Sequence, residues 1–188
     1  MAVISLILLA ALAPVRRVTP NGQMFFMGAG FMLLETKTIV HLALLFGSTW
    51  MVNAIVIGAI LALILCSNLF VQMVKPVRVW GYYVLLGVSL VAGIAIPLNT
   101  LLGLPPATRL VASCTLALLP IFFAGIVFAT TFRDSRQPDV DFGSNVGGAV
   151  LGGLTEPLSL LVGFRYLLVV ALGYYGLSAI LNRTGSTT

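Results

Sequence analysis

The sequence predicts an all-α protein, an integral membrane helical bundle of about seven transmembrane helices. Hydrophobic residues make up 60% of the 188 residues and charged residues only 8%, whereas a soluble domain carries about 25% charged residues. The apolar residues also gather in long runs that are separated by turn residues, as expected of helices that cross a bilayer. Because no separating segment is long enough to divide the chain, we expect a single transmembrane domain over 1–188.

Individual spans follow from the length that a bilayer requires, about 20 apolar residues. Six runs approach or exceed this length, and a seventh run at the N-terminus is shorter because Pro14 and two arginines end it. The runs are separated by turn-forming residues, such as Pro20-Asn21-Gly22, Gly47-Ser48-Thr49, Lys75-Pro76 and Gly163. In chain order, the expected spans are 1–15, 24–46, 50–74, 79–102, 109–132, 142–162 and 165–181.

The basic residues predict how the bundle is oriented. With seven crossings, only Arg109 and Arg165 fall on one side of the membrane. The other side collects Arg16, Arg17, Lys75, Arg78, Arg133, Arg136 and Arg183. Because basic loops stay in the cytoplasm, this asymmetry predicts a cytoplasmic C-terminus. The longest loop, 133–141, mixes basic and acidic residues, and it is either a solvated connector or a docking surface for a cytoplasmic partner.

Four ionisable residues lie inside the expected spans and form the candidate intramembrane polar cluster. Glu35, Lys37 and His41 belong to the span 24–46, and Glu156 belongs to the span 142–162. Such residues cost several kcal/mol in a bilayer unless they are paired or hydrated. At 100° per residue, Glu35 points about 200° away from Lys37, whereas Lys37 and His41 share a face. We therefore expect this helix to be central in the bundle or to meet a partner protein.

The span 142–162 presents small and polar residues along one stripe, which favours close approach of another helix. The stripe comprises Asn145, Gly148, Gly152, Glu156, Ser159 and Gly163. We expect the helix 24–46 to pack there, with Glu156 paired to Lys37. Three roles remain open for the cluster: a structural pair or protonated acids, a pathway for an ion, proton or amine, and a contact with a partner. Pro157 should interrupt the helix beside Glu156.

Several classes of function find no support in the residues. The basic residues are scattered, so nucleic-acid binding is not expected. Cys66, Cys114 and the single histidine have no companions at ligand spacing, so neither a metal site nor a redox motif is predicted. There is no P-loop, GxSxG or HExxH, and the run Gly28-Ala29-Gly30 is not a dinucleotide fingerprint. We expect no catalytic residue and no cofactor.

Two blocks carry a family resemblance: FFMGAGFMLLETKTIVHLALLFGSTWMVNA from Phe25, and residues 119–181, especially FFAGIVFATTFRDSRQPDVDFGSNVGGAVLGGLTEPLSLLVGFRYLL. Together they resemble the transmembrane region of bacterial membrane-bound spermidine synthase-like proteins. In that family, membrane helices accompany a Rossmann-like domain that binds decarboxylated or ordinary S-adenosylmethionine. This sequence has no such domain, so the resemblance implies no enzymatic activity here. It implies a multi-pass protein of the bacterial inner (cytoplasmic) membrane.

Three hypotheses follow for the function. The first is a non-catalytic membrane domain or subunit that anchors or scaffolds a larger complex, with the lipid bilayer and other membrane subunits as its partners. The alternative is a carrier of a small solute, for example a cationic amine, that uses Glu35 and Glu156 as cation partners. The third is a subunit that gives a separate cytoplasmic synthase access to the membrane.

Overall fold

The computed structural model describes residues 19–96, 98–159 and 163–185, and within these ranges the chain is all-helical, without a strand. The expected all-α class is therefore confirmed for the described part, and the expected span 1–15 lies outside it. The helices are α2 (Gly22–Phe46), α3 (Trp50–Val74), α4 (Trp80–Ala95), α5 (Leu98–Leu102), α6 (Pro106–Arg133), α7 (Pro138–Thr155), the 3-10 helix η1 (Glu156–Leu158) and α9 (Phe164–Gly185).

Three helices of the described part, α2, α3 and α6, are long and apolar enough to cross a membrane. Two further apolar helices are shorter: α4, and the stretch Tyr166–Asn182 within α9. Length and composition of these helices thus support a membrane protein.

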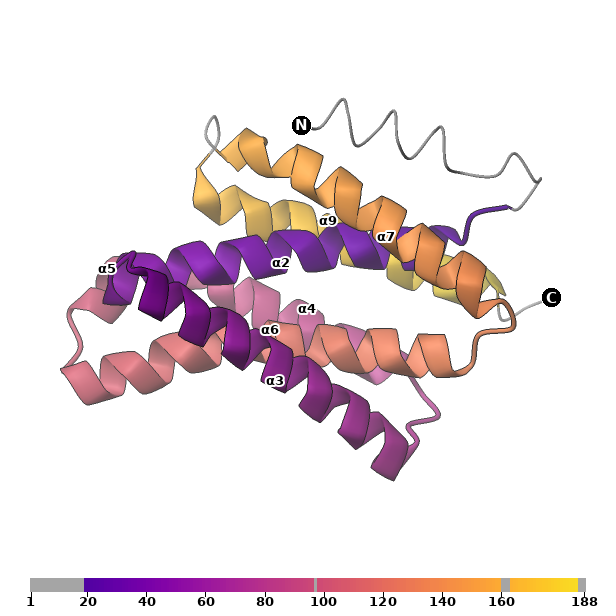
Figure 1. The fold of residues 1–188 in the computed structure, drawn as a ribbon, viewed down its shortest axis with the longest axis horizontal. Coiled ribbons are helices and arrows are strands. Elements are labelled where there is room, and N and C mark those ends of the chain that lie inside the picture. Colours follow the sequence, from indigo (N-terminus) through magenta and orange to yellow (C-terminus); the bar gives the residue numbers. More distant parts are fainter. Residues whose placement is uncertain (1–18, 97, 160–162, 186–188) are drawn as a thin grey trace.

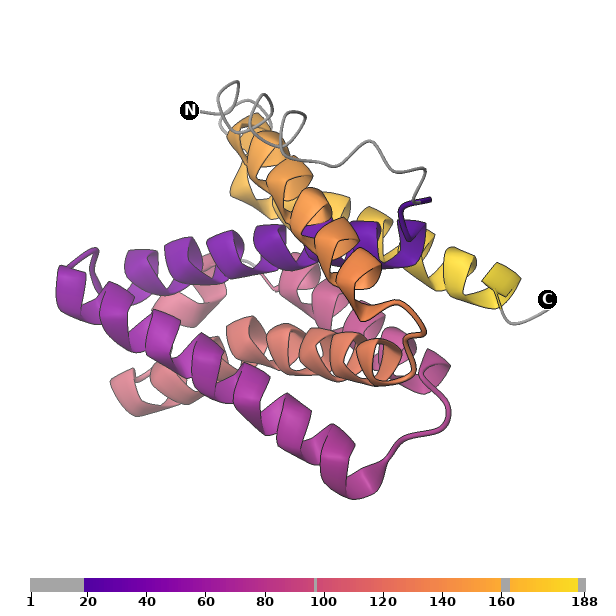
Figure 2. The same ribbon diagram turned by 45° about the vertical axis from the view of Figure 1, so that its right-hand side comes forward.

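Helix α2 runs lengthwise through the middle of the molecule (Figure 1). It packs against α7 and α9 on one side, and against α6 and α3 on the other. Helix α4 completes the bundle by packing on α6 and α9, whereas α3 diverges from α2 beyond the turn that joins them (Figure 2). Of the two alternatives expected for the helix 24–46, a central position or a contact with a partner protein, the structure shows the first.

The connections between helices separate into two groups at opposite ends of the bundle (Figures 1 and 2). One end holds the connections α3–α4 and α6–α7, together with the start of α2 and the end of α9. Lys75, Arg78, Arg133 and Arg136 lie in or next to these two connections. The opposite end holds the connections α2–α3 and α5–α6, and neither of these carries a charged residue. The basic connections therefore share one end.

The turn between α2 and α3 shows how the sequence ends one helix and starts the next. Gly47 adopts φ 102°, a region in which side chains are strained, and its N–H still bonds to the Ala43 carbonyl. The Thr49 hydroxyl then accepts the N–H of Val52 at 3.3 Å and caps α3. Since the helix 50–74 was expected between these same turn signals, its bounds agree with the structure.

The bundle surface is apolar and part of its interior is polar. Helix α3 is the clearest case, because its side chains Ile55, Leu61 and Met73 are 65%, 61% and 83% exposed. By contrast, Ser67 of the same helix is fully buried, and its hydroxyl donates to the carbonyl of Phe122 in α6 at 2.9 Å. An apolar exterior of this extent is rare in a soluble monomer and suits contact with lipid or with another membrane protein.

The expected span 79–102 is not one helix. Helix α4 ends at Ala95, and Ile96 adopts an extended backbone, with φ −88° and ψ 109°. The physical reason is Pro97, since a proline disfavours helical geometry in the residue before it and cannot donate to the preceding turn. The helix resumes as the short α5.

The connection between α6 and α7 is shorter than the expected loop 133–141, because α7 already begins at Pro138. Proline is favoured at the first position of a helix, and Asp139 and Asp141 in the first turn suit its positive dipole end. At the far end, α7 stops at Thr155 and continues as a 3-10 turn over Glu156–Leu158. The interruption expected at Pro157 is therefore present.

Candidate functional site

The candidate polar cluster is only partly brought together. Glu35, Lys37 and His41 lie in the second half of α2, and Glu156 begins η1 after α7. The Nζ of Lys37 lies 3.1 Å from the Nδ1 of His41, one helical turn away. Glu35 and Glu156 are half-buried, and within the described residues the structure gives neither carboxylate a hydrogen-bond or ion-pair partner. The cluster thus divides into a basic pair and two separate acids.

The Lys37–His41 contact restricts the protonation of the imidazole. When the Lys37 ammonium donates to Nδ1, the ring is neutral and its hydrogen sits on Nε2. His41 is only 9% exposed, and its Nε2 has no hydrogen-bond partner within the described residues. In that tautomer, Nε2–H is a buried donor without an acceptor among the described residues.

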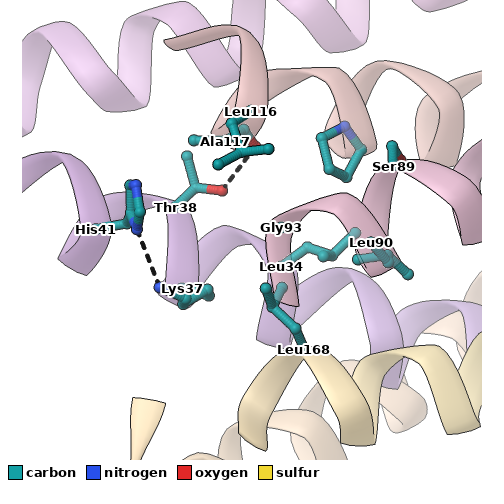
Figure 3. A pocket seen from close by; sticks show the side chains of 11 residues that line it. Leu34, Lys37, Thr38, His41, Ser89, Leu90, Gly93, Leu116, Ala117 and Leu168 are labelled. Carbon is teal, nitrogen blue, oxygen red and sulfur yellow. Dashed lines mark hydrogen bonds between the residues drawn. The ribbon is translucent and has the colours of Figure 1, made fainter. Parts of the chain in front are cut away.

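A small cavity lies beside this pair, between α2, α4, α6 and α9. Figure 3 shows Lys37 and His41 projecting side by side from α2, while the Thr38 hydroxyl donates to the Ala117 carbonyl at 3.1 Å. On the α4 side, the Ser89 hydroxyl donates to the carbonyl of Leu86. The cavity measures about 30 Å³, which admits one water-sized molecule. An organic solute would not fit in this space.

The structure shows no ion pair between Lys37 and Glu156, which were expected to pair. The register of α2 and α7 explains this difference. Gly148 lies against Phe25 and Gly152 against Ala29, so Glu156 falls level with residue 33. Lys37 is four residues beyond that level and is directed toward His41.

The small-residue stripe of α7 does form the close helix contact that the sequence predicts. A Cβ atom on Gly148 would overlap the Phe25 carbonyl, and one on Gly152 would lie 2.5 Å from the Ala29 carbonyl. Gly28 plays the same part on α2, because a Cβ there would overlap the Asn145 carbonyl. The backbones of α2 and α7 therefore touch, as do glycine-rich helix pairs in membranes.

Polar side chains join the N-terminal ends of α2 and α7, a contact that was not predicted from the sequence. The Asn21 amide donates to Asp141 Oδ1 at 2.7 Å, and its backbone N–H donates to the Ser144 hydroxyl at 2.9 Å. One turn further, the Asn145 amide donates to the Met24 carbonyl at 3.2 Å. The available signal was Asn21, since asparagine before an apolar run is a preferred helix cap. Asp141 is 8% exposed, so this acid is structural.

A second buried network connects α2, α4 and α9 near the same end. The Tyr83 hydroxyl lies 2.7 Å from the Ser178 hydroxyl and also accepts the Gln23 side-chain amide at 3.3 Å. Ser178 in turn donates to the Gln23 carbonyl at 3.1 Å. Because each polar group has a partner, the network fixes three helices against one another.

A larger cavity of about 220 Å³ lies where α2, α3, α6, α7 and α9 meet. Its walls are mainly apolar and aromatic, and polar groups come from Asn68, Asn145 and Tyr175. Phe142 lines it and is 56% exposed, so the cavity reaches the surface of the bundle. A third cavity, of about 290 Å³, lies between α4, α5 and α6 and is also mostly apolar. Neither Glu35 nor Glu156 lines any of these three cavities.

Outside the candidate cluster, Arg133 and Asp134 form an ion pair at 2.8 Å at the end of α6. The hydrogen bond from this guanidinium lowers the pKa of Asp134. Arg133 also donates to the Pro76 carbonyl at 3.1 Å, which ties the connection α3–α4 to the end of α6. Both side chains are exposed, so the pair positions a connection and adds little stability.

The fold and these contacts define a helical bundle with an apolar surface and small polar networks between its helices. No group of three or more metal-binding side chains occurs among the residues that the structure describes. Comparison of the chain with models of known protein families, with curated proteins and with solved structures found no match.

Proposed function

We propose that the chain is a non-catalytic integral membrane subunit, a bundle of about seven transmembrane helices that anchors or scaffolds a larger complex. The observation that carries this proposal is the position of Glu35. It lies in the middle of α2, is half-buried, and has no partner within the described residues. An acid at the centre of a membrane costs several kcal/mol unless it is paired or hydrated. A second membrane protein that covers this position would remove the cost.

The apolar exterior is compatible with such assembly. Helix α3 packs on the bundle mainly through one stripe, which comprises Val56, Ile60, Ser67 and Val71, and exposes most of its other side chains. A helix with one packed face has the remaining surface available for lipid or for further helices. The proposal therefore requires no rearrangement of the bundle.

The alternative, a carrier of a small cationic solute, predicts a cavity that reaches Glu35 or Glu156. The three cavities are lined by neither carboxylate, and the large one offers amides and a phenol in place of charge. A cation in that cavity would meet no carboxylate among the lining residues. This observation favours the scaffold over the carrier.

The orientation is part of the proposal: the end that holds the basic connections faces the cytoplasm of a bacterial inner membrane. A cysteine at Ser48, in a version without Cys66 and Cys114, should react with a membrane-impermeant maleimide on intact cells. A cysteine at Ser135 should react only after the membrane is permeabilised. The reverse pattern would contradict the orientation, and labelling of both would contradict the number of crossings between them.

The family resemblance suggests one class of partner. A bundle that resembles the membrane region of spermidine synthase-like proteins would hold a separate synthase-like chain at the membrane. This remains the more specific version of the scaffold proposal, and a synthase-like chain in the purified complex would support it.

Purification in mild detergent tests the proposal directly. We expect other membrane proteins to co-purify at fixed stoichiometry, measured by native mass spectrometry and light scattering. Glu35→Gln should change the assembled fraction while the isolated bundle keeps its helix content. A stable lone monomer that transports a solute would refute the scaffold.

A further inference from the structure

The mainly apolar cavity of about 220 Å³ opens at the surface between α3 and α7, and this opening is here called the groove. Acidic residues lie on two of the helices around it, Glu35 on α2 and Glu156 at the end of α7. Phe31 of α2, Ile64 and Asn68 of α3, and Phe142 of α7 line the cavity of about 220 Å³ at its base. Because the exposed Phe142 forms part of this wall, the cavity continues into the surface groove between the two helices.

Glu35 lies on the groove side of α2. It follows the cavity-lining Phe31 by four residues, and residues four apart share a face of a helix. Lys37 is about 200° away from Glu35 around the helix axis, so it lies on the opposite face of α2, where it contacts His41. The acid and the base of α2 therefore belong to different surfaces of the bundle.

Glu156 lies on the groove side of α7 by the same reasoning. It follows the cavity-lining Phe142 by fourteen residues, close to four helical turns. Its backbone is still helical, with φ −55° and ψ −45°, so the register of α7 holds up to this residue. The α2–α7 contacts place it level with residue 33, and Glu35 lies only about 3 Å further along the axis. Two acids thus flank one groove at one depth.

We propose that this groove receives one transmembrane helix of a partner protein that carries a lysine or arginine near its midpoint. This inference rests on the proposed function and names the docking surface and the partner's chemistry. Two acids at one depth of a bilayer repel each other and are costly, and a basic side chain between them relieves both effects. A lipid tail has no charge, and the cavities offer a small cation no carboxylate. The apolar side chains of such a helix would cover the groove, and its one basic side chain would pair with the two acids.

Photo-crosslinking of the full chain in its native membrane tests this docking site. A photoreactive phenylalanine analogue replaces Leu61, which is 61% exposed and lies seven residues before Asn68 on the same face of α3. The matched control is Val88, which is 62% exposed at the middle of α4, away from the groove. We expect an adduct from Leu61 but not from Val88, with a transmembrane segment that has Lys or Arg in its central third.

Charge variants complete the test. Glu35→Gln together with Glu156→Gln should lower the adduct yield at least tenfold at unchanged helix content. Glu35→Lys should abolish the adduct, and replacement of the partner's base by glutamate should restore it. An adduct only with lipid, with the chain itself, or with a segment that lacks a basic residue would overturn the inference. If partners co-purify but crosslink from Val88 alone, the docking site is wrong and the scaffold stands. If no membrane protein co-purifies, the scaffold itself fails.

Discussion

Gly152→Ala is the sharpest test of the central contact between α2 and α7. The new Cβ would lie 2.5 Å from the Ala29 carbonyl, whereas ordinary contacts begin at 3.4 Å, so the helices must separate by about 0.9 Å (3.4 − 2.5). The obstacle is backbone of a buried helix and cannot rotate away. Overpacking of this kind costs about 1–3 kcal/mol, which corresponds to a change of roughly 5-fold to 150-fold in the unfolding equilibrium.

The neighbouring glycine provides the control. A Cβ on Gly153 would meet nothing within 4 Å, so Gly153→Ala changes the same helix without the clash. Both substitutions gain the same helix propensity, up to about 1 kcal/mol, so the difference between them isolates the contact. Unfolding in mixed detergent micelles, followed by circular dichroism, measures both variants. Equal stability of the two variants would refute the packing of α7 on α2.

Other predictions concern the two polar networks at the end of the bundle. Asp141→Ala removes the acceptor of the Asn21 amide and should lower the free energy of unfolding by about 1–3 kcal/mol, whereas Asp139→Ala, at an exposed position in the same turn, should leave it nearly unchanged. Equal effects of the two would show that the hydrogen bond between Asn21 and Asp141 is not formed. Tyr83→Phe removes the buried hydroxyl that contacts Ser178 and should cost about 0.6–1.7 kcal/mol in the same assay; an unchanged midpoint would contradict the network.

Features that depend on a single helix, such as the ends of α3 and the packing face of α7, were predicted correctly from the sequence. The helix 50–74 begins after a capping threonine and ends before Lys75-Pro76, and these local signals place both ends correctly. The packing face that contains Gly148 and Gly152 was also predictable, because small residues at helical spacing mark such a face even when the partner helix is unknown. Whether a segment is helical, and which of its faces packs, depends mainly on its own residues, so both can be predicted from that segment.

Features that depend on the register between two helices could not be predicted. Lys37 and Glu156 were expected to pair because their depths were similar, but depth alone does not say how far each helix is rotated or displaced. The contact of Gly148 with Phe25 fixes that register and leaves Glu156 level with residue 33. The Asn21–Asp141 bond was missed for a related reason, since Asp141 was assigned to a loop when it lies in the first turn of α7.

The central position of α2 has a consequence for the order in which the protein is made. Its contacts are with segments synthesised much later: Met24 bonds to Asn145 across 121 residues, and Gln23 bonds to Ser178 across 155. At about 5–20 residues per second, a ribosome needs roughly 6 to 24 s to add 121 residues. During that interval α2 has left the ribosome, with its acid, lysine and histidine, but without α7 and α9. Until α7 and α9 are synthesised, the faces of α2 that these two helices cover in the folded bundle therefore stay uncovered by them.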